Sequence, residues 1–454
     1  MAFIPIYILI LFTTILVDYI SGILIDKSRG RRRAIILALS IVTNLGMLGF
    51  FKYFNFVASN IAQLFSFFGW SCPVHTLPII LPIGLSFHTF QSMGYTVEVY
   101  RGRKPEYHPG VFALYVMFYP QLVAGPIERP NNLLVQLKQP KDLDYQRIAD
   151  GLKLMAWGFF KKLVIADRLA VIVDQVYGKP TNYQGVILAS ATICFAYQIY
   201  CDFSGYTDIA IGAARVMGFD LMKNFSQPYL SSSVSEFWKR WHISLSSWFR
   251  DYLYIPLGGN RVSKWRHRFN LILVFLLSGL WHGASWTFII WGLIHGGYLI
   301  LSIWTKGLRQ KIVDITGVGN YPVFHNVLRI SLTFLAVCFA WIFFRAPDIS
   351  TAWYIVTHLW TGWYDLLVNL QAPAAIRNTF SSLNLPVLLP ALVSIVILEL
   401  AGYFHNTYSR QGGGAARILA SRPVLIRWSA YYALFCWILL FGRFGTKQFI
   451  YFQF

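Results

Sequence analysis

The sequence predicts an all-helical membrane protein that crosses the bilayer many times, and three observations lead to this class. The chain of 454 residues is 56% hydrophobic and only 13% charged, whereas soluble domains carry about 25% charged residues. Apolar runs recur along the whole length, so we expect a single membrane domain over 1–454 rather than a soluble domain on an anchor. The alternation typical of outer-membrane barrel strands is not visible.

The apolar runs are the candidate membrane helices, because a spanning helix needs about 20 mostly apolar residues. They lie at 2–25, 34–57, 77–99, 111–125, 151–177, 185–200, 203–219, 269–301, 326–345, 384–404 and 425–445. We expect roughly nine to eleven transmembrane or re-entrant helices. The 111–125 run is short, which favours a re-entrant segment. The 269–301 run is too long for one straight crossing and rich in glycine, so we expect it to be broken or tilted.

The first run begins near the N-terminus and lacks the basic region and cleavage site of a signal peptide, so it predicts a membrane helix. Basic clusters follow it at 29–33 (RGRRR) and return at 101–104 (RGRK). Cytoplasmic loops are enriched in Lys and Arg, so both clusters are predicted to be cytoplasmic. The runs 34–57 and 77–99 then form a hairpin between them.

The net charge of +20 comes largely from such short loops. This distribution indicates anionic lipid headgroups as partners and argues against nucleic acid. The five cysteines include no C-x-x-C pair, so we expect neither a disulfide framework nor a metal site.

The segment 220–268 is not a simple membrane span. Apolar residues recur at helical spacing and predict one aromatic helix face, formed by Trp238, Trp241, Leu245, Trp248 and Tyr252. Basic residues lie elsewhere on the wheel, so we expect a helix that lies at the interface or dips into the protein. A second irregular segment, 347–383, is amphipathic and has less chemical content.

His282 stands in the sequence SGLWHGASW, within the long apolar run. Ionisable residues at membrane depth are costly and usually face a pathway or a site. Gly279 and Gly283 leave room for close approach of backbone or ligand, and Trp281 and Trp286 can wall a pocket. The sequence therefore predicts a functional base at His282. The alternative is a structural histidine bonded to a neighbouring helix.

His242 is the predicted partner of His282. Two histidines can divide the work of acyl transfer, since one can take a hydroxyl proton while the other polarises or orients. The alternative for His242 is an interfacial histidine beside basic residues. His295 would lie roughly 20 Å beyond His282 on a continuous helix, so we expect it to be structural.

Asp202 and Asp208 form a polar stripe with Tyr206 and neighbouring hydroxyl groups inside an apolar run. An unpaired carboxylate at this depth is expensive. We therefore expect at least one of them to pair with an Arg or Tyr of 238–261, in a structural rather than a catalytic role.

Several long motifs resemble the membrane-bound O-acyltransferase family. They are EFWKRWHISLSSWFRDYLYIPLGGNR (236–261), GLWHGASWTFIIWG (279–292), FYPQLVAGPIERP (118–130), YCDFSGYTDIAIGAARVMGFDLMKNFSQPYLSSS (200–233), FAWIFFRAPDIS (339–350) and the terminal FIYFQF. The resemblance implies transfer of an acyl group from a thioester to a hydroxyl group. It places the essential histidine at His282 and the second at His242, meeting in a central tunnel within a catalytic core of about 77–301.

The same resemblance implies the partners. The donor, acetyl-CoA or another acyl thioester, enters from the cytoplasm, and no cofactor is bound. The wording of the motifs is closest to the branch that O-acetylates exported, alginate-like polysaccharides in the bacterial inner membrane with periplasmic SGNH-type proteins. Members of that branch usually carry an additional pair of apolar segments ahead of the region matched here, so we expect a shorter form or a misassigned start.

These expectations also assign supporting roles. A hydroxyl group is a weak nucleophile and needs a base within hydrogen-bond reach, which His282 would supply without a serine or cysteine nucleophile. The expected supporting residues are Trp281, Trp286, Trp241, Asp202, Asp208, Tyr206 and Arg250. Teichoic acid (D-alanyl transfer), peptidoglycan and cellulose are alternative acceptors. A proton-coupled transporter is the alternative class, but its usual inverted repeats are not visible.

Overall fold

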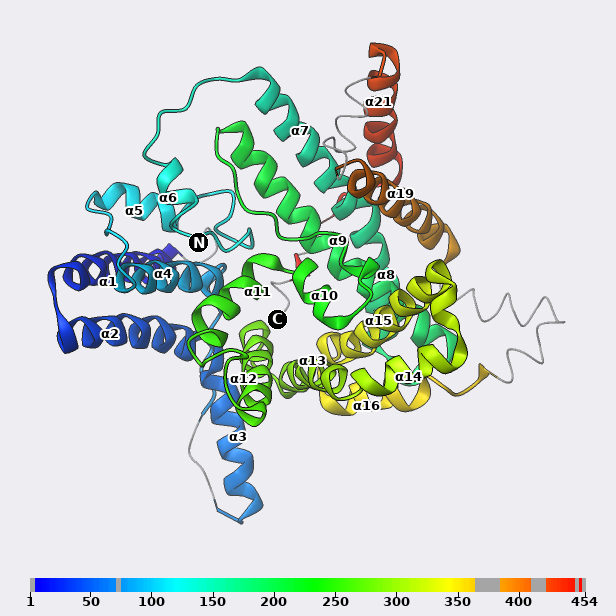
Figure 1. The fold of residues 1–454 in the computed structure, drawn as a ribbon, viewed down its shortest axis with the longest axis horizontal. Coiled ribbons are helices and arrows are strands. Elements are labelled where there is room, and N and C mark those ends of the chain that lie inside the picture. The colour runs from blue at the N-terminus through cyan, green and yellow to red at the C-terminus, as the bar shows by residue number, and fades with distance from the viewer. Residues whose placement is uncertain (1–4, 71–74, 364–383, 410–421, 446–448, 451–454) are drawn as a thin grey trace.

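Helices are the only regular elements in the described residues (5–70, 75–363, 384–409, 422–445 and 449–450) of the computed structural model (Figure 1). In chain order they are α1 (Ile8–Lys27), α2 (Gly30–Leu48), α3 (Phe54–Phe67), α4 (Leu85–Tyr100), α5 (Pro109–Val116), α6 (Leu133–Gln136), α7 (Tyr145–Phe159), α8 (Asp167–Gly178), α9 (Val186–Val216), α10 (Val234–Arg240), α11 (Ile243–Phe249), α12 (Lys264–His282), α13 (Trp286–Trp304), α14 (Lys306–Thr316), α15 (Pro322–Arg345), α16 (Ile349–His358), α19 (Leu385–Ser409) and α21 (Val424–Phe441). The all-helical class is confirmed.

Seven helical segments of the described chain are long and apolar enough to cross a membrane. One of them, Gly30–Phe67, joins α2 to α3 through the π-helical turn η2 (Gly49–Tyr53). The predicted runs 185–200 and 203–219 are a single helix, α9. Most of its polar residues face the protein interior and do not mark a turn, so the two runs belong to one helix. Cys72, 364–383 and 451–454 lie outside the described residues.

The core of the fold is a close crossing of α7 and α9. A Cβ atom added to Gly158 would lie 2.6 Å from the carbonyl oxygen of Gly205, and one added to Gly151 would lie 2.7 Å from that of Gly212. Small residues let membrane helices approach this closely. The crossing presses the π-helical turn η3 (Phe160–Ala166), which carries two lysines, against the acidic stripe of α9.

The segment 220–268 enters the protein, where Figure 1 shows α10 and α11 near the middle of the view. The expected single aromatic helix is wrong, because the chain turns sharply at His242, whose φ is +43°. Two short helices replace it and converge from different directions. Four of the five predicted face residues are buried, namely Trp238, Trp241, Leu245 and Trp248. The aromatic face is therefore interior packing and not an interfacial surface.

Candidate active site

His282 is the last residue of α12 and lies beside a break in the long apolar run. Gly283 is extended, and α13 starts at an N-cap, Ser285, whose Oγ accepts a hydrogen bond from the Thr287 backbone N–H at 3.3 Å. The chain then folds back so that α13 packs along α12. The expected break in 269–301 is confirmed.

Gly279 and Gly283 provide room for the backbone and the packing of α13, not for a ligand. A Cβ atom at Gly279 would lie 2.2 Å from the Phe288 carbonyl oxygen, and one at Gly283 would lie 2.1 Å from the Phe288 ring. Of the two possibilities that the sequence left open, the structure selects close approach within the protein.

Aromatic rings enclose the His282 imidazole, which is only 4% exposed. Ring centroids lie 5.0 Å away at Trp281, 5.1 Å away at Trp291 and 5.2 Å away at Phe344. These rings come from α12, α13 and α15, so three helices hold one imidazole. Such a setting keeps the imidazole largely out of contact with bulk water.

His242 is fully buried and its ring centroid lies 6.3 Å from that of His282. Trp281 contacts both rings, at 5.8 Å from His242 and 5.0 Å from His282. The two histidines come from different elements, the start of α11 and the end of α12. The structure therefore brings together the pair that the sequence singled out.

Asn224 holds the His242 ring in one tautomer. The Asn224 Oδ1 atom meets the Ser244 backbone N–H at 3.1 Å and the His242 Nδ1 atom at 3.2 Å. A backbone N–H can only donate, so the Asn224 atom is an oxygen, and His242 Nδ1–H donates to it. In the neutral ring, Nε2 then carries the lone pair. His242 is thus an acceptor at Nε2.

Asn224 is the site residue that sequence reasoning missed. It is fully buried and lies in an irregular stretch, so no periodicity points to it. Glu128 ties this stretch to the 118–130 loop by accepting the Met222 backbone N–H at 2.6 Å. Burial raises the pKa of Glu128 to about 7. The only signal in the sequence was that Asn224 falls inside one of the long motifs.

The predicted supporting aromatics occupy different surroundings. Trp241 is buried against Phe225 and Trp341, and its ring centroid lies 5.1 Å from that of each. Tyr206 packs against Phe449 at 5.0 Å. Trp286 is 50% exposed and donates from Nε1 to Asn60 Oδ1 of α3 at 2.7 Å. Trp286 therefore anchors the start of α13 and is not among the rings that surround His282.

Asp202 and Asp208 are paired with lysines of η3. Asp208 Oδ2 lies 2.7 Å from Lys161 Nζ, and Asp202 Oδ1 lies 2.8 Å from Lys162 Nζ. Asp202 also accepts the Ile450 backbone N–H at 2.9 Å. The expected partner, an Arg or Tyr of 238–261, is wrong. The lysines reach the stripe because the α7–α9 glycine contacts bring η3 onto α9.

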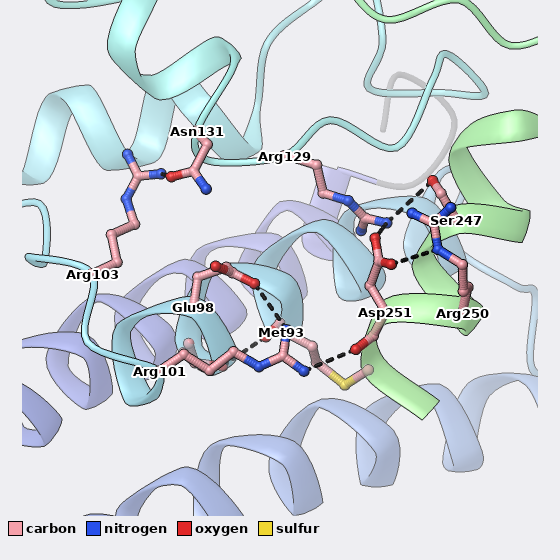
Figure 2. A network of polar contacts seen from close by, with 10 residues as sticks. Met93, Glu98, Arg101, Arg103, Arg129, Asn131, Ser247, Arg250 and Asp251 are labelled. Atoms are coloured by element: carbon pink, nitrogen blue, oxygen red, sulfur yellow. Dashed lines mark hydrogen bonds and ion pairs between the residues drawn. The ribbon is translucent and has the colours of Figure 1, made fainter. Parts of the chain in front are cut away.

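Arg250 belongs to a separate polar network, shown in Figure 2. Its Nε atom donates to Asp251 Oδ1 at 2.7 Å, and Arg129 lies 3.6 Å from the other oxygen of Asp251. Arg101 donates to the Asp251 carbonyl oxygen at 2.8 Å. The guanidinium groups of Arg101 and Arg129 lie over the Tyr252 ring, at 5.1 and 4.8 Å. This network combines one of the basic clusters, at 101–104, with the end of the 236–261 motif.

His295 lies nearer to His282 than a continuous helix would allow, because α13 folds back. Trp291 contacts both rings, at 5.1 Å from His282 and 5.0 Å from His295. Trp238 Nε1–H donates to His295 Nδ1 at 3.2 Å. His295 is therefore held as a hydrogen-bond acceptor within aromatic packing.

The described residues contain no group of three or more His, Cys, Asp or Glu side chains that could hold a metal ion. The site instead brings two imidazole rings together, with their centroids 6.3 Å apart, in a buried aromatic setting. Such a pair can accept and return one proton.

Comparison with known proteins places this geometry in context. The model of the membrane-bound O-acyltransferase family matches residues 98–343. A probable alginate O-acetylase AlgI of Pseudomonas aeruginosa is 42% identical over 349 residues, which are 76% of this chain and 64% of that protein. One of Pseudomonas putida is 35% identical over 92% of this chain and 84% of its own length. A peptidoglycan O-acetyltransferase of Helicobacter pylori is 37% identical over 70% of this chain and 63% of its own length. The chain thus spans less than two thirds of the first and third of these relatives.

Proposed function

This chain belongs to the membrane-bound O-acyltransferase family, and from that premise we propose that it transfers an acetyl group from a thioester to a hydroxyl group of an exported polysaccharide. The observation that carries the proposal is the buried pair His242 and His282, whose ring centroids lie 6.3 Å apart. The relatives named for alginate acetylation make an alginate-like polymer the first acceptor to test.

In the proposed reaction His282 is the general base. It takes the proton of the acceptor hydroxyl as that oxygen attacks the thioester carbonyl carbon. The new C–O bond forms, the C–S bond breaks, and the thiolate that leaves recovers the proton from the imidazolium. His242 carries its lone pair at Nε2, so it suits orienting the hydroxyl group more than polarising the carbonyl.

We propose acetyl-CoA or a related acyl thioester as the donor, arriving from the side of the network in Figure 2. The guanidinium groups of Arg101 and Arg129 lie over the Tyr252 ring. From Tyr252 a series of contacting aromatic rings extends to Trp281, beside His282. Tyr252 contacts Trp248 at 5.1 Å, Trp248 stacks on Phe90 at 4.0 Å, and Phe90 contacts Trp281 at 5.6 Å. Arginine side chains bind phosphate groups well, so Arg101 and Arg129 suit the phosphates of such a donor. The neighbouring aromatic side chains suit the uncharged chain that carries its acyl group.

The proposed setting is the bacterial inner membrane, with the basic clusters at 29–33 and 101–104 on the cytoplasmic side. Acceptor and donor then meet from opposite faces, which gives a reason for the depth of His282. Periplasmic SGNH-type proteins are the proposed partners in passing the acetyl group to the polymer.

The test is the acetyl-ester content of exported polymer in cells that lack this gene and in cells that regain it. Ester content should fall on deletion and return with the intact gene. Ester loss from peptidoglycan, or loss of D-alanyl esters from teichoic acid, would move the assignment to those acceptors. Unchanged esters in every polymer, together with altered proton or solute flux, would favour a transporter.

His242→Ala should impair transfer less than loss of His282. Without this ring the hydroxyl group would be poorly oriented, and misplacement alone costs roughly tenfold to a hundredfold in rate. The measurement is acetyl-ester content at matched protein level. Asn224→Ala is a second variant, which removes the hydrogen bond that fixes the tautomer of the His242 ring. Full activity in the His242→Ala protein would show that His242 takes no part in the reaction.

A further inference from the structure

Lys52 is an ionisable residue in the middle of the apolar segment Gly30–Phe67. Such a residue at membrane depth is expensive and calls for a partner. The ion pairs between described residues do not include Lys52. Its partners are backbone carbonyls at the end of α12.

Lys52 and its neighbour close the end of the helix that carries His282. Lys52 Nζ donates to the carbonyl oxygens of Trp281 and His282, at 2.6 and 3.0 Å. The Tyr53 hydroxyl donates to the Leu280 carbonyl oxygen at 2.5 Å. The last carbonyls of a helix lack partners within the helix, and a cation there also interacts favourably with the helix dipole.

The same part of the chain also holds the other side of the break. Asn60 Oδ1, in α3, accepts from Trp286 Nε1 at 2.7 Å, and Phe56 contacts the Trp286 ring at 5.9 Å. The π-helical turn η2 presents Lys52 and Tyr53 together, and such turns are frequent at functional sites. Lys52, Tyr53 and Asn60 therefore hold the end of α12, where His282 lies, and the start of α13.

We propose that Lys52 is a positioning residue for His282, acting through the backbone of α12. The inference rests on the proposed function. His282 is the terminal residue of its helix, so the Lys52 ammonium group, and not a following helical turn, holds its carbonyl oxygen. Loss of the cation would free the last turn and displace the imidazole from the attacking hydroxyl.

The test compares Lys52→Met with Lys52→Arg in inside-out membrane vesicles supplied with acetyl-CoA. The readout is release of coenzyme A above that of His282→Ala vesicles. Lys52→Met should lower kcat roughly tenfold to a hundredfold, the effect of a displaced catalytic group, with little change in KM for acetyl-CoA. Lys52→Arg keeps a cation and several donors, so it should regain most of the rate.

A matched pair tests the neighbouring bond. Tyr53→Phe removes the hydroxyl that meets the Leu280 carbonyl and should lower kcat. Tyr298→Phe removes a comparable bond to the Ala336 carbonyl oxygen, at 3.0 Å, in the α13–α15 contact, and should leave kcat unchanged. If Lys52→Met does not accumulate as folded protein, Tyr53→Phe carries the test alone.

Parental kcat in Lys52→Met, or equal rates in Tyr53→Phe and Tyr298→Phe, would overturn the proposal. The proposal would also be overturned if Lys52→Met and Lys52→Arg lost the same amount of thermal stability and the same fraction of kcat. That pattern indicates that Lys52 is only a structural helix cap. If the parent protein itself shows no release that depends on His282, the proposed function fails instead, and the two failures are distinguishable.

Discussion

His282→Ala is expected to abolish acyl transfer while the protein still folds and inserts. Loss of a positioned proton-transfer group costs about 10²–10⁴-fold in rate. The rings around the imidazole are anchored by three different helices, so they remain in place without it. The measurement is acetylation of exported polymer in cells that carry each variant at matched protein level. His282→Asn serves as a second variant that fills more of the space.

The internal control is His295, a buried histidine one tryptophan ring away from His282. His295→Gln keeps a side-chain oxygen that can accept from Trp238, so it should retain most activity. Substantial acetylation in the His282→Ala strain would refute the general-base role.

Lys162→Met is expected to be the most destabilising of the substitutions considered. Lys162 Nζ lies 2.8 Å from Asp202 and 2.9 Å from Asp167, and both carboxylates are buried. Breaking a buried ion pair by removing one partner costs about 3–5 kcal/mol, because a desolvated charge remains. Folded yield in detergent and the thermal unfolding midpoint should both fall. Asp202→Asn and Asp208→Asn should act in the same direction.

Lys153→Met is the matched control, since Lys153 lies on α7 and pairs at 3.0 Å with Asp150 in an exposed setting. Exposed pairs contribute about 0–1 kcal/mol, so this variant should fold normally. If Asp202→Asn and Lys162→Met were produced in normal amounts with unchanged midpoints yet lacked activity, these residues would act in the chemistry and the structural role would be wrong.

Much of the architecture follows from local sequence patterns. Composition and the length of the apolar runs predicted helices throughout, because a bilayer leaves the backbone few other ways to satisfy its hydrogen bonds. Glycines and excess length predicted the break next to His282. The rarity of histidine in such runs singled out His282, and the motif around His242 supplied its partner.

The tertiary structure decided how the polar groups are matched. Lys161 and Lys162 lie within the apolar run 151–177. The glycine contacts of α7 and α9 bring them to Asp202 and Asp208 in place of the expected Arg or Tyr of 238–261. Asn224 meets His242 from 18 residues away in an irregular stretch, and Lys52 meets the end of α12 from 229 residues away. Periodicity and composition describe each segment by itself. The partner of a buried charge or imidazole depends instead on which segments pack together.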